Sequence, residues 1–536
     1  MIANPIVLIL VVLSVVITIF VAYYSRRWMT STAEFYVAGR KISWMQNGIA
    51  LVGDYLSAAS FLGVAGAIAL AGIDRIWIGI GFFGGYMAVL MLIAGPLRNV
   101  GTYTVADALY KRFKWAPIKI AVMLSTIVIS VFYLVPQILG AGILFELVLG
   151  WDFKVVTIAV GILMGAYIVL GGMRATTYNQ IIQGVLLWGV MVFIVVLVLF
   201  VVFDGSFVKL FDIMNMTVPP DVAAKAGEKV RAATQLESLA AIQAVKGALP
   251  AAPSAMTPGI MTPTVIAQLS TVLALVFGTA GLPHILIRFY TVPTAADAKK
   301  SVAVVLIAIG LFYIAAILVG FMSMYLLYPQ LLDWILAKKV GLATNMPVLL
   351  TSKLMGGDFL MGIAAAGAVA AMLSTAAGLL IATSSSITRD LYASFINKNA
   401  SEKDEIRIAR ITTAVMSGIA IMIALLLKGE NVAWLVTLAF GMAASALFPA
   451  LVCTLWWKRF TRQAAVAGIV TGLTVASLFI ILHLSGVKSF LGLTVVGSPG
   501  IYSITASFLA ILLVTAFTKD RGDVDNFFAL AHAEEK

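Results

Sequence analysis

Charged residues are scarce in this chain. They make up 11% of its 536 residues, whereas a soluble domain carries about 25%. Hydrophobic residues reach 62%, and the mean hydropathy is +1.05. So little charge excludes an ordinary soluble domain. The composition predicts an all-α integral membrane protein whose apolar helices lie in a lipid bilayer.

Cysteine and nucleotide-binding motifs are also lacking. Cys453 is the single cysteine, so no intramolecular disulfide can form, and we expect it to be a packing residue. No Walker motif and no paired-cysteine metal pattern occurs, which leaves ATP-driven pumping without visible machinery. We expect neither an enzyme nor an organic cofactor, and nothing indicates an obligatory protein partner.

Long apolar runs are what the chain does contain. With roughly 20 residues per span, the sequence predicts about thirteen transmembrane helices, near 4–24, 45–72, 76–98, 117–148, 153–171, 177–203, 264–287, 300–328, 358–386, 407–427, 431–457, 463–484 and 500–518. The first run lacks a basic n-region and exceeds the length of a signal-peptide core, so we expect it to stay as a helix.

The net charge of +12 is spread over alternate connections between these helices. Nucleic-acid binding would instead need a basic patch or stripe. By the positive-inside rule the basic connections are cytoplasmic. We therefore expect a multi-pass protein of the cell inner membrane, with its amino end outside and its carboxyl end inside.

Two of the predicted helices are interrupted near their centres. Gly278, Gly281 and Pro283 break the run from 268 to 289, and Gly53 with Asp54 breaks the run from 47 to 63. Inside a bilayer, broken backbone is tolerated only where protein or a water-filled cavity satisfies its polar groups. Paired interruptions in the two halves of a chain indicate the binding site of a secondary transporter.

The order of the helices predicts an inverted repeat. Helices two to six and seven to eleven flank one long loop, and halves with an odd number of spans have opposite orientations. The expected segments are a peripheral first helix (1–30), a first half of the core (31–203), an extracytoplasmic loop (204–263), a second half (264–457), two peripheral helices (458–518) and a cytoplasmic tail (519–536). The loop is expected to be partly helical between Ala223 and Val245.

Predicted helix nine is rich in small residues. Ala371, Ser374 and Thr375 stand on one face at i, i+3 and i+4, where they offer a carbonyl and two hydroxyl oxygens to a hard cation. The alternative is that this helix merely packs closely against its neighbours, with its hydroxyls bonded to their own backbone.

Several separated motifs carry a family resemblance: GDYLSAASFLG (Gly53 to Gly63), YIVLGGMRATTYNQIIQG (Tyr167 to Gly184), GTAGLPHILIRFYT (Gly278 to Thr291) and SSSITRDLY (Ser384 to Tyr392). Over about residues 30–520 the chain resembles the sodium:solute symporter family, and within it the cation/acetate symporter branch. The resemblance implies a LeuT-type 5+5 inverted-repeat core with helices two and seven broken. It also implies sodium-coupled import of a short monocarboxylate, with acetate the first candidate.

The resemblance also implies a sodium site. Its ligands are the carbonyls of Gly53, Leu56 and Ala371 and the side-chain oxygens of Ser374 and Thr375. Some relatives carry alanine at the position of Gly53, and a carbonyl serves with either residue. The alternatives are a symporter for pyruvate, lactate or proline, a solute-sensing receptor, and a channel, although no filter-like motif occurs.

Asp54 is an acid placed deep in a predicted span, where a carboxylate costs about 2.5–3.5 kcal/mol. One interpretation is a cap on the amides that the break frees. The other is a cation or proton site beside the sodium ion.

For a small carboxylate, the expected anchors are amides at the half-helix termini around Thr279, Ala280 and Gly281. Additional candidates are the hydrogen-bonding residues Ser57, Ser60 and Gln137 and the pocket walls or gates Tyr55 and Phe277. Each of them has interhelical packing as its alternative.

His284 and Arg288 lie one turn apart on predicted helix seven. We interpret the pair as a structural lock, although an arginine at the end of a span snorkels by default. Gly171 and Gly172 are expected to form a tight turn before helix six.

Overall fold

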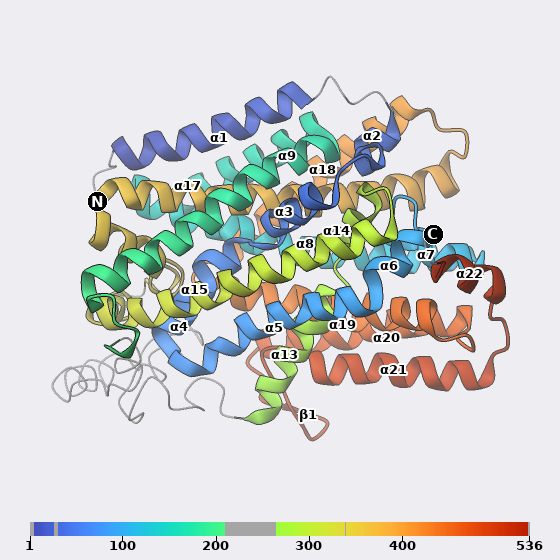
Figure 1. Cartoon of the computed structure of the whole chain (residues 1–536). Coiled ribbons are helices and arrows are strands. Elements are labelled where there is room, and N and C mark those ends of the chain that lie inside the picture. The colour runs from blue at the N-terminus through green and yellow to red at the C-terminus, as the bar shows by residue number, and fades with distance from the viewer. Residues whose placement is uncertain (1–4, 26–30, 210–263, 338, 534–536) are drawn as a thin grey trace.

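The computed structural model describes residues 5–25, 31–209, 264–337 and 339–533. The long helices run side by side along one direction (Figure 1). In the described part of the chain, eleven helices are long and apolar enough to cross a membrane. The predicted all-α membrane fold is therefore confirmed. The residues from 223 to 245, predicted to be partly helical, lie outside the described residues.

The continuous long helices form most of the bundle. They are α1 (Pro5–Ser25), α8 (Ala116–Leu149), α9 (Phe153–Phe203), α15 (Ala295–Leu336), α17 (Pro347–Ser386), α18 (Glu402–Leu426), α19 (Val432–Trp456), α20 (Arg462–Leu484) and α21 (Gly500–Phe517). The most apolar stretches of α17 and α19 are almost wholly buried. These two helices form the centre of the bundle.

Two of the crossings are interrupted, and both lie where the sequence predicts them. In the first half, α3 (Trp44–Tyr55) is followed by a π-helical turn (Ala59–Gly63) and α4 (Val64–Ala71). In the second half, α13 (Val265–Thr279) is followed by α14 (Pro283–Ile287). A further crossing, α5 (Ile76–Ala88) with α6 (Ala94–Val100), contains a π-helical turn.

Some helix boundaries differ from the prediction. The two helices expected at 153–171 and 177–203 are joined in α9, which bends at Gly172 (φ 57°, ψ −170°). This backbone conformation is open to glycine alone, so the expected tight turn is a kink. Helix α17 begins at Pro347 and bends at Gly356 and Gly357, and a π-helical turn (Ile387–Ile396) extends it past the predicted end at 386.

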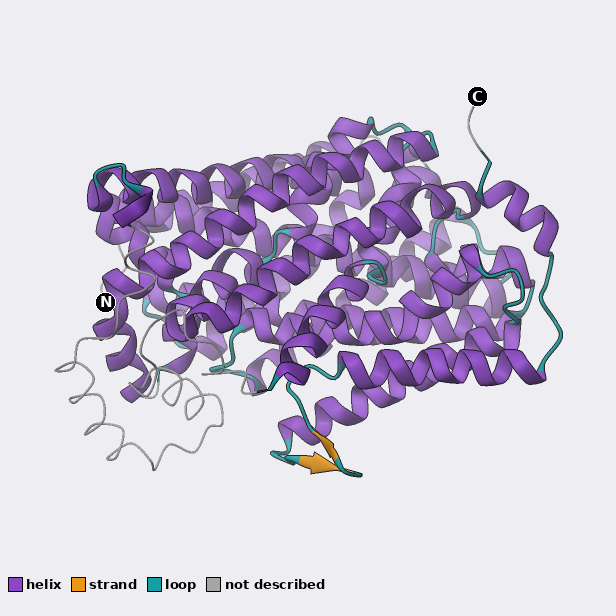
Figure 2. Cartoon of the chain, turned by 60° about the horizontal axis from the view of Figure 1, so that its bottom comes forward, coloured by secondary structure: helices purple, strands orange, loops and turns teal. Residues whose placement is uncertain are grey.

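Shorter elements cover the two ends of the bundle. The helices are α2 (Thr32–Val37), α7 (Val105–Phe113), α16 (Val340–Asn345) and α22 (Val524–Ala531). Strands β1 (Ser489–Phe490) and β2 (Leu493–Thr494) pair antiparallel, Ser489 opposite Thr494, and project from the bundle (Figure 2).

The chain after α21 is tied back to the bundle by Arg112 of α7. This side chain is fully buried and donates to six backbone carbonyls, at 2.6–3.3 Å: those of Cys453, Thr454, Trp457, Lys458, Phe460 and Arg521. Burial lowers the pKa of Arg112 to about 10, which still leaves it charged at neutral pH. One cation therefore satisfies the carboxyl end of α19 and holds the tail.

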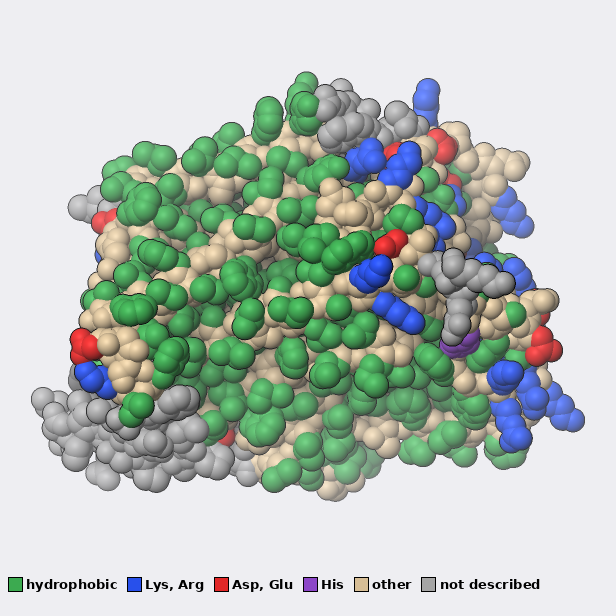
Figure 3. Space-filling view, in the orientation of Figure 1, with side chains coloured by type: hydrophobic (Ala, Val, Ile, Leu, Met, Phe, Trp, Pro, Cys, Tyr) green, Lys and Arg blue, Asp and Glu red, His purple; other side chains and the backbone are tan. Residues whose placement is uncertain are grey.

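The surface is that of a membrane protein. Hydrophobic side chains cover the face seen in Figure 3, and most of its Lys and Arg side chains gather at one end of the helix bundle. Cys453 is buried in α19, as expected.

Candidate functional site

The break after α3 exposes backbone groups that a side chain from α8 satisfies. Leu56 leaves the helical conformation (φ −72°, ψ 87°), and the Ala58 amide donates to Gln137 Oε1 at 3.1 Å. Gln137 Nε2 in turn donates to Tyr133 O at 3.4 Å. An unpaired buried amide costs about 1–3 kcal/mol, so Gln137 stabilises the broken helix. The sequence predicts Gln137 as a substrate contact, and its side chain here bonds the backbone at the break.

Oxygen atoms of α3 and α17 converge beside this break. Ser374 Oγ donates to Gly53 O at 2.6 Å, and Thr375 Oγ1 donates to Asp54 O at 2.7 Å. All four residues are buried. Ala371 lies one turn before Thr375 on the same buried helix, and Leu56 lies in the break. The predicted ligand residues Gly53, Ser374 and Thr375 are thus brought together, with the carbonyl of Asp54 as an unexpected fourth group.

Helix α9 crosses α3 at Gly53 with no room for a side chain. A Cβ atom on Gly53 would lie 2.0 Å from Gln180 O, and one on Gly184 would lie 2.9 Å from Gly53 Cα. Gln180 Nε2 also donates to Ser374 O at 3.1 Å. The expectation that alanine serves equally well at residue 53 does not fit this packing.

Asp54 forms an ion pair with Arg288, the residue that follows α14. Their Oδ2 and Nε atoms are 3.3 Å apart, and the side chains are 0% and 1% exposed. Arg288 Nη1 also donates to Thr177 Oγ1 at 2.7 Å. Arg288 therefore does not snorkel to the surface. The Asp54 carboxylate bonds the Arg288 side chain, and the Ala58 amide at the break bonds Gln137 instead.

The second oxygen of Asp54 faces α17. A Cβ atom on Gly378 would lie 2.3 Å from Asp54 Oδ1, and the Gln180 side chain also lies close enough to interact with this carboxylate. The position of the carboxylate is therefore fixed on one side by Arg288 and on the other by a residue that must be small.

His284 is fully buried, and its ring lies edge-on to Tyr133 at 5.3 Å. Within the described residues neither ring nitrogen has a hydrogen-bond partner. The sequence predicts that His284 and Arg288 form a structural lock. Arg288 supplies the polar link between the broken helices, and His284 contributes an aromatic contact.

An aromatic cluster surrounds the two breaks. Tyr55 packs against Tyr86 and Phe440, with ring centroids 4.7 and 6.1 Å apart. Its hydroxyl bonds Thr279 Oγ1 at 2.8 Å and donates to Phe82 O at 2.9 Å. The sequence singled out Tyr55 and Thr279 but not the aromatic partners Tyr86 and Phe440, because these lie on α5 and α19 and no motif marks them.

The other predicted substrate residues are buried, except for the partly buried Phe277, and most of them are engaged. Ser60 Oγ lies 2.8 Å from the hydroxyl oxygen of Tyr313, and Thr279 Oγ1 donates to Leu275 O at 2.8 Å. Phe277 stacks on Phe448 at 4.6 Å. Ser57 is 1% exposed.

The amides at the second break are less available than the sequence suggests. Gly281 N donates to Gly278 O at 2.8 Å, and α14 starts at Pro283, which has no N–H. Ala280 is buried at the end of α13. A Cβ atom on Gly281 would lie 2.5 Å from Ala443 O, so this turn packs directly on α19.

The candidate site is buried in this conformation, since Gly53 is buried and Asp54, Ser374 and Thr375 are 0% exposed. Solute entry therefore requires a rearrangement of the broken helices against their neighbours.

Comparison with known proteins gives concordant results. The model of the sodium:solute symporter family matches residues 35–472. The chain is 38% identical over 521 residues to the uncharacterized symporter YwcA of Bacillus subtilis, covering 96% of this chain and 94% of that protein. It is 38% identical over 528 residues to the monocarboxylic acid transporter of Corynebacterium glutamicum, covering 95% and 91%.

Solved structures support the fold. A Na⁺-coupled sialic acid symporter, substrate-bound and outward-open, is similar with a TM-score of 0.70 at 16% identity, over 97% of this chain and 99% of that one. Mhp1, a nucleobase-cation-symport-1 family transporter in a closed conformation with bromovinylhydantoin bound, is similar with a TM-score of 0.51 at 14% identity, over 94% and 99%. These likenesses confirm a LeuT-type fold.

Proposed function

The chain belongs to the sodium:solute symporter family, and on that premise we propose that it imports a short-chain monocarboxylate, acetate first, together with Na⁺. The family supports sodium as the coupling ion, and the relative named a monocarboxylic acid transporter supports the substrate class. Transport proceeds by alternating access, with the broken helices opening to one side at a time.

One observation carries the cation site of this proposal. The hydroxyl oxygens of Ser374 and Thr375 lie 2.6 and 2.7 Å from the carbonyl oxygens of Gly53 and Asp54. Neutral oxygens from two elements are suitable ligands for a hard cation. When Na⁺ enters, the hydroxyl hydrogens turn away and their oxygens bind the ion. The carbonyls of Leu56 and Ala371 are proposed as further ligands.

The proposed carboxylate site lies between the two breaks. Ser57, Ser60 and Gln137 border the first break, and Thr279, Ala280 and Gly281 form the second. Tyr55 joins the two through its bond to Thr279, which supports it as a gate. A small solute suits such a site, because side chains from α5, α8 and α19 fill the surroundings.

Uptake by the purified protein in proteoliposomes tests this function. Labelled acetate, pyruvate, lactate and proline are compared with and without an inward sodium gradient. We expect saturable acetate uptake that depends on the gradient. Preference for another solute would overturn the assignment of acetate as the substrate. Non-saturable flux that does not depend on sodium would indicate a channel. Binding without uptake would indicate a receptor.

A further inference from the structure

The first turns of α18 carry three acids and three bases, and the acids are held by hydrogen bonds or an ion pair. Glu402 accepts from Thr32 Oγ1 at 3.2 Å, Asp404 from Ser401 Oγ at 2.7 Å, and Glu405 from Arg389 at 2.8 Å. The bases are exposed Lys403, Arg407 and Arg410. None of them takes part in an ion pair found in the described part of the chain. Three positive charges therefore remain available to an anion.

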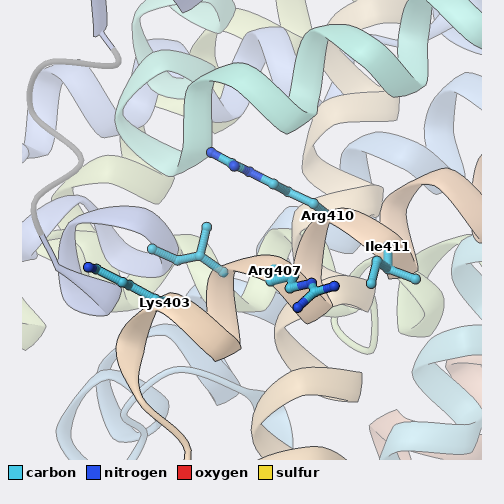
Figure 4. Close-up of a pocket in the computed structure, with 5 residues that line it drawn as sticks. Lys403, Arg407, Arg410 and Ile411 are labelled. Atoms are coloured by element: carbon cyan, nitrogen blue, oxygen red, sulfur yellow. The ribbon is translucent and has the colours of Figure 1, made fainter.

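These bases line one cavity. They stand at i, i+4 and i+7, which places them on one face of the helix. The cavity has a volume of about 480 Å³, and Ile406 and Ile411 complete its lining. Figure 4 shows Lys403 and Arg410 reaching over the same open space from different turns of α18. The groove combines positive charge with apolar surface.

An apolar surface continues from the groove along the same helix face. Ile411, Val415, Met422 and Leu426 are all exposed. Gly418 lies among them, and a Cβ atom there would meet no other atom within 4 Å. The spacing of three or four residues keeps these positions in line with Arg407 and Arg410. Exposed aliphatic side chains on a spanning helix face lipid.

We propose that the groove of Lys403, Arg407 and Arg410 binds the headgroup of an anionic phospholipid, with an acyl chain lying along the stripe from Ile411 to Leu426 past Gly418. Basic residues at the end of a spanning helix attract anionic lipids of the cytoplasmic leaflet. A free phosphate would use the charges alone, whereas a lipid also uses the apolar stripe. Because the basic groove and the apolar stripe are continuous, the site fits a lipid rather than a free phosphate.

The bound lipid would hold a helix that supports the transport core. Helix α18 packs against α8, α9 and α17, and its first turn is joined to α2 by Glu402 and to the end of α17 by Glu405. The anionic headgroup would offset the three charges and stabilise this end of the bundle.

Native mass spectrometry of the delipidated full chain with phosphatidylglycerol or phosphatidylcholine tests the site. We expect one tightly held phosphatidylglycerol. Lys403→Gln, Arg407→Gln and Arg410→Gln should each weaken its binding by roughly fivefold, and the triple variant that combines them, called the groove variant, should weaken it further. A matched triple variant, Lys458→Gln with Arg459→Gln and Lys519→Gln, removes three exposed charges elsewhere and should leave this adduct within about twofold. An equal loss in both triple variants would overturn the proposal.

A second variant and a second ligand separate lipid from phosphate. Gly418→Leu places a large side chain in the proposed path of the acyl chain without changing charge. It should therefore weaken the binding of phosphatidylglycerol and leave the binding of inorganic phosphate unchanged. The melting temperature should rise when phosphatidylglycerol is added. It should not rise with inorganic phosphate at the same concentration. If inorganic phosphate raises the melting temperature of the unsubstituted protein but not that of the groove variant, the groove is a phosphate site instead. Unchanged lipid binding in the groove variant would show that the site is absent.

Discussion

Single oxygen atoms define the proposed sodium site. Ser374 and Thr375 lie on one helix and Gly53 and Asp54 on another, so the ion would hold the two helices together. Each hydroxyl is small, and its removal leaves the backbone of α17 intact. The residue scale is therefore where cation binding and folding can be separated.

Ser374→Ala or Thr375→Ala is expected to raise the sodium concentration for half-maximal uptake by about tenfold, since loss of one ligand oxygen costs about 1–2 kcal/mol. Thr383→Ala is the matched control, because Thr383 Oγ1 bonds Leu379 O within the same helix. Sodium titration of uptake makes the measurement. Equal sodium dependence in all three variants would contradict the site.

Gly378→Ala tests the position of Asp54. Its new methyl group would lie 2.3 Å from Asp54 Oδ1, so the carboxylate must move. We expect loss of most sodium-stimulated uptake. Gly367→Ala on the same helix meets its nearest atom at 3.8 Å and should transport normally. Equal uptake by the two variants would show that the position of this carboxylate is unimportant.

Asp54→Asn should also abolish most sodium-stimulated uptake, but for two separable reasons. It removes a proposed cation group, and it leaves the buried Arg288 without its counter-charge, which costs about 3–5 kcal/mol. Adding Arg288→Gln should restore thermal stability without restoring coupling. If the double variant regains sodium-driven uptake, Asp54 serves only to neutralise Arg288.

At the scale of elements, much of the fold can be predicted from the sequence. Glycine and proline mark both breaks, and spans of apolar residues mark the helices, because bilayer thickness sets their length. The continuity of α9 was missed, since a glycine that bends a helix and one that ends it look alike in sequence.

The partnerships inside the site could not be predicted to the same extent. Asp54 and Arg288 are 234 residues apart, and both were singled out, yet no local pattern shows that they meet. Gln137 and Gly378 likewise acquire their roles only from the crossing of helices. The sequence shows that small and polar residues gather in these helices. It does not show which of them touch, because their contacts depend on tertiary packing.

The close packing of α3 against α9 at Gly53 can be tested by substitution. Gly53→Ala would place a methyl group 2.0 Å from Gln180 O and force the helices apart. We expect a lower melting temperature and little uptake. Gly189→Ala on α9, where no atom lies within 4 Å of the new methyl group, should be neutral. Normal transport by Gly53→Ala would contradict such tight packing.

At the scale of the whole molecule, the charges of the site bear on energetics. Because Asp54 and Arg288 neutralise each other, the proposed site carries no net charge before Na⁺ and a carboxylate enter. One of each moves no net charge, so a membrane potential of 100 mV, worth about 2.3 kcal/mol per charge, does no work on the cycle. A tenfold sodium gradient then supplies about 1.4 kcal/mol.

Electroneutral transport is therefore expected. Current recorded on a solid-supported membrane during sodium-driven acetate uptake should show no sustained charge movement. A sustained positive current that scales with uptake would show that a second cation travels, and Asp54→Asn should then abolish it.

The contacts of Arg112 also constrain the order in which the molecule is completed during synthesis. Its guanidinium belongs to α7, but its acceptors come from the end of α19 and from Arg521. A ribosome makes the cation hundreds of residues before its last partner. Five of the six acceptors arrive with the end of α19, so Arg112 satisfies that end as soon as it is made. The bond to Arg521 forms afterwards, so the segment behind α21 docks onto a cation site that is already assembled.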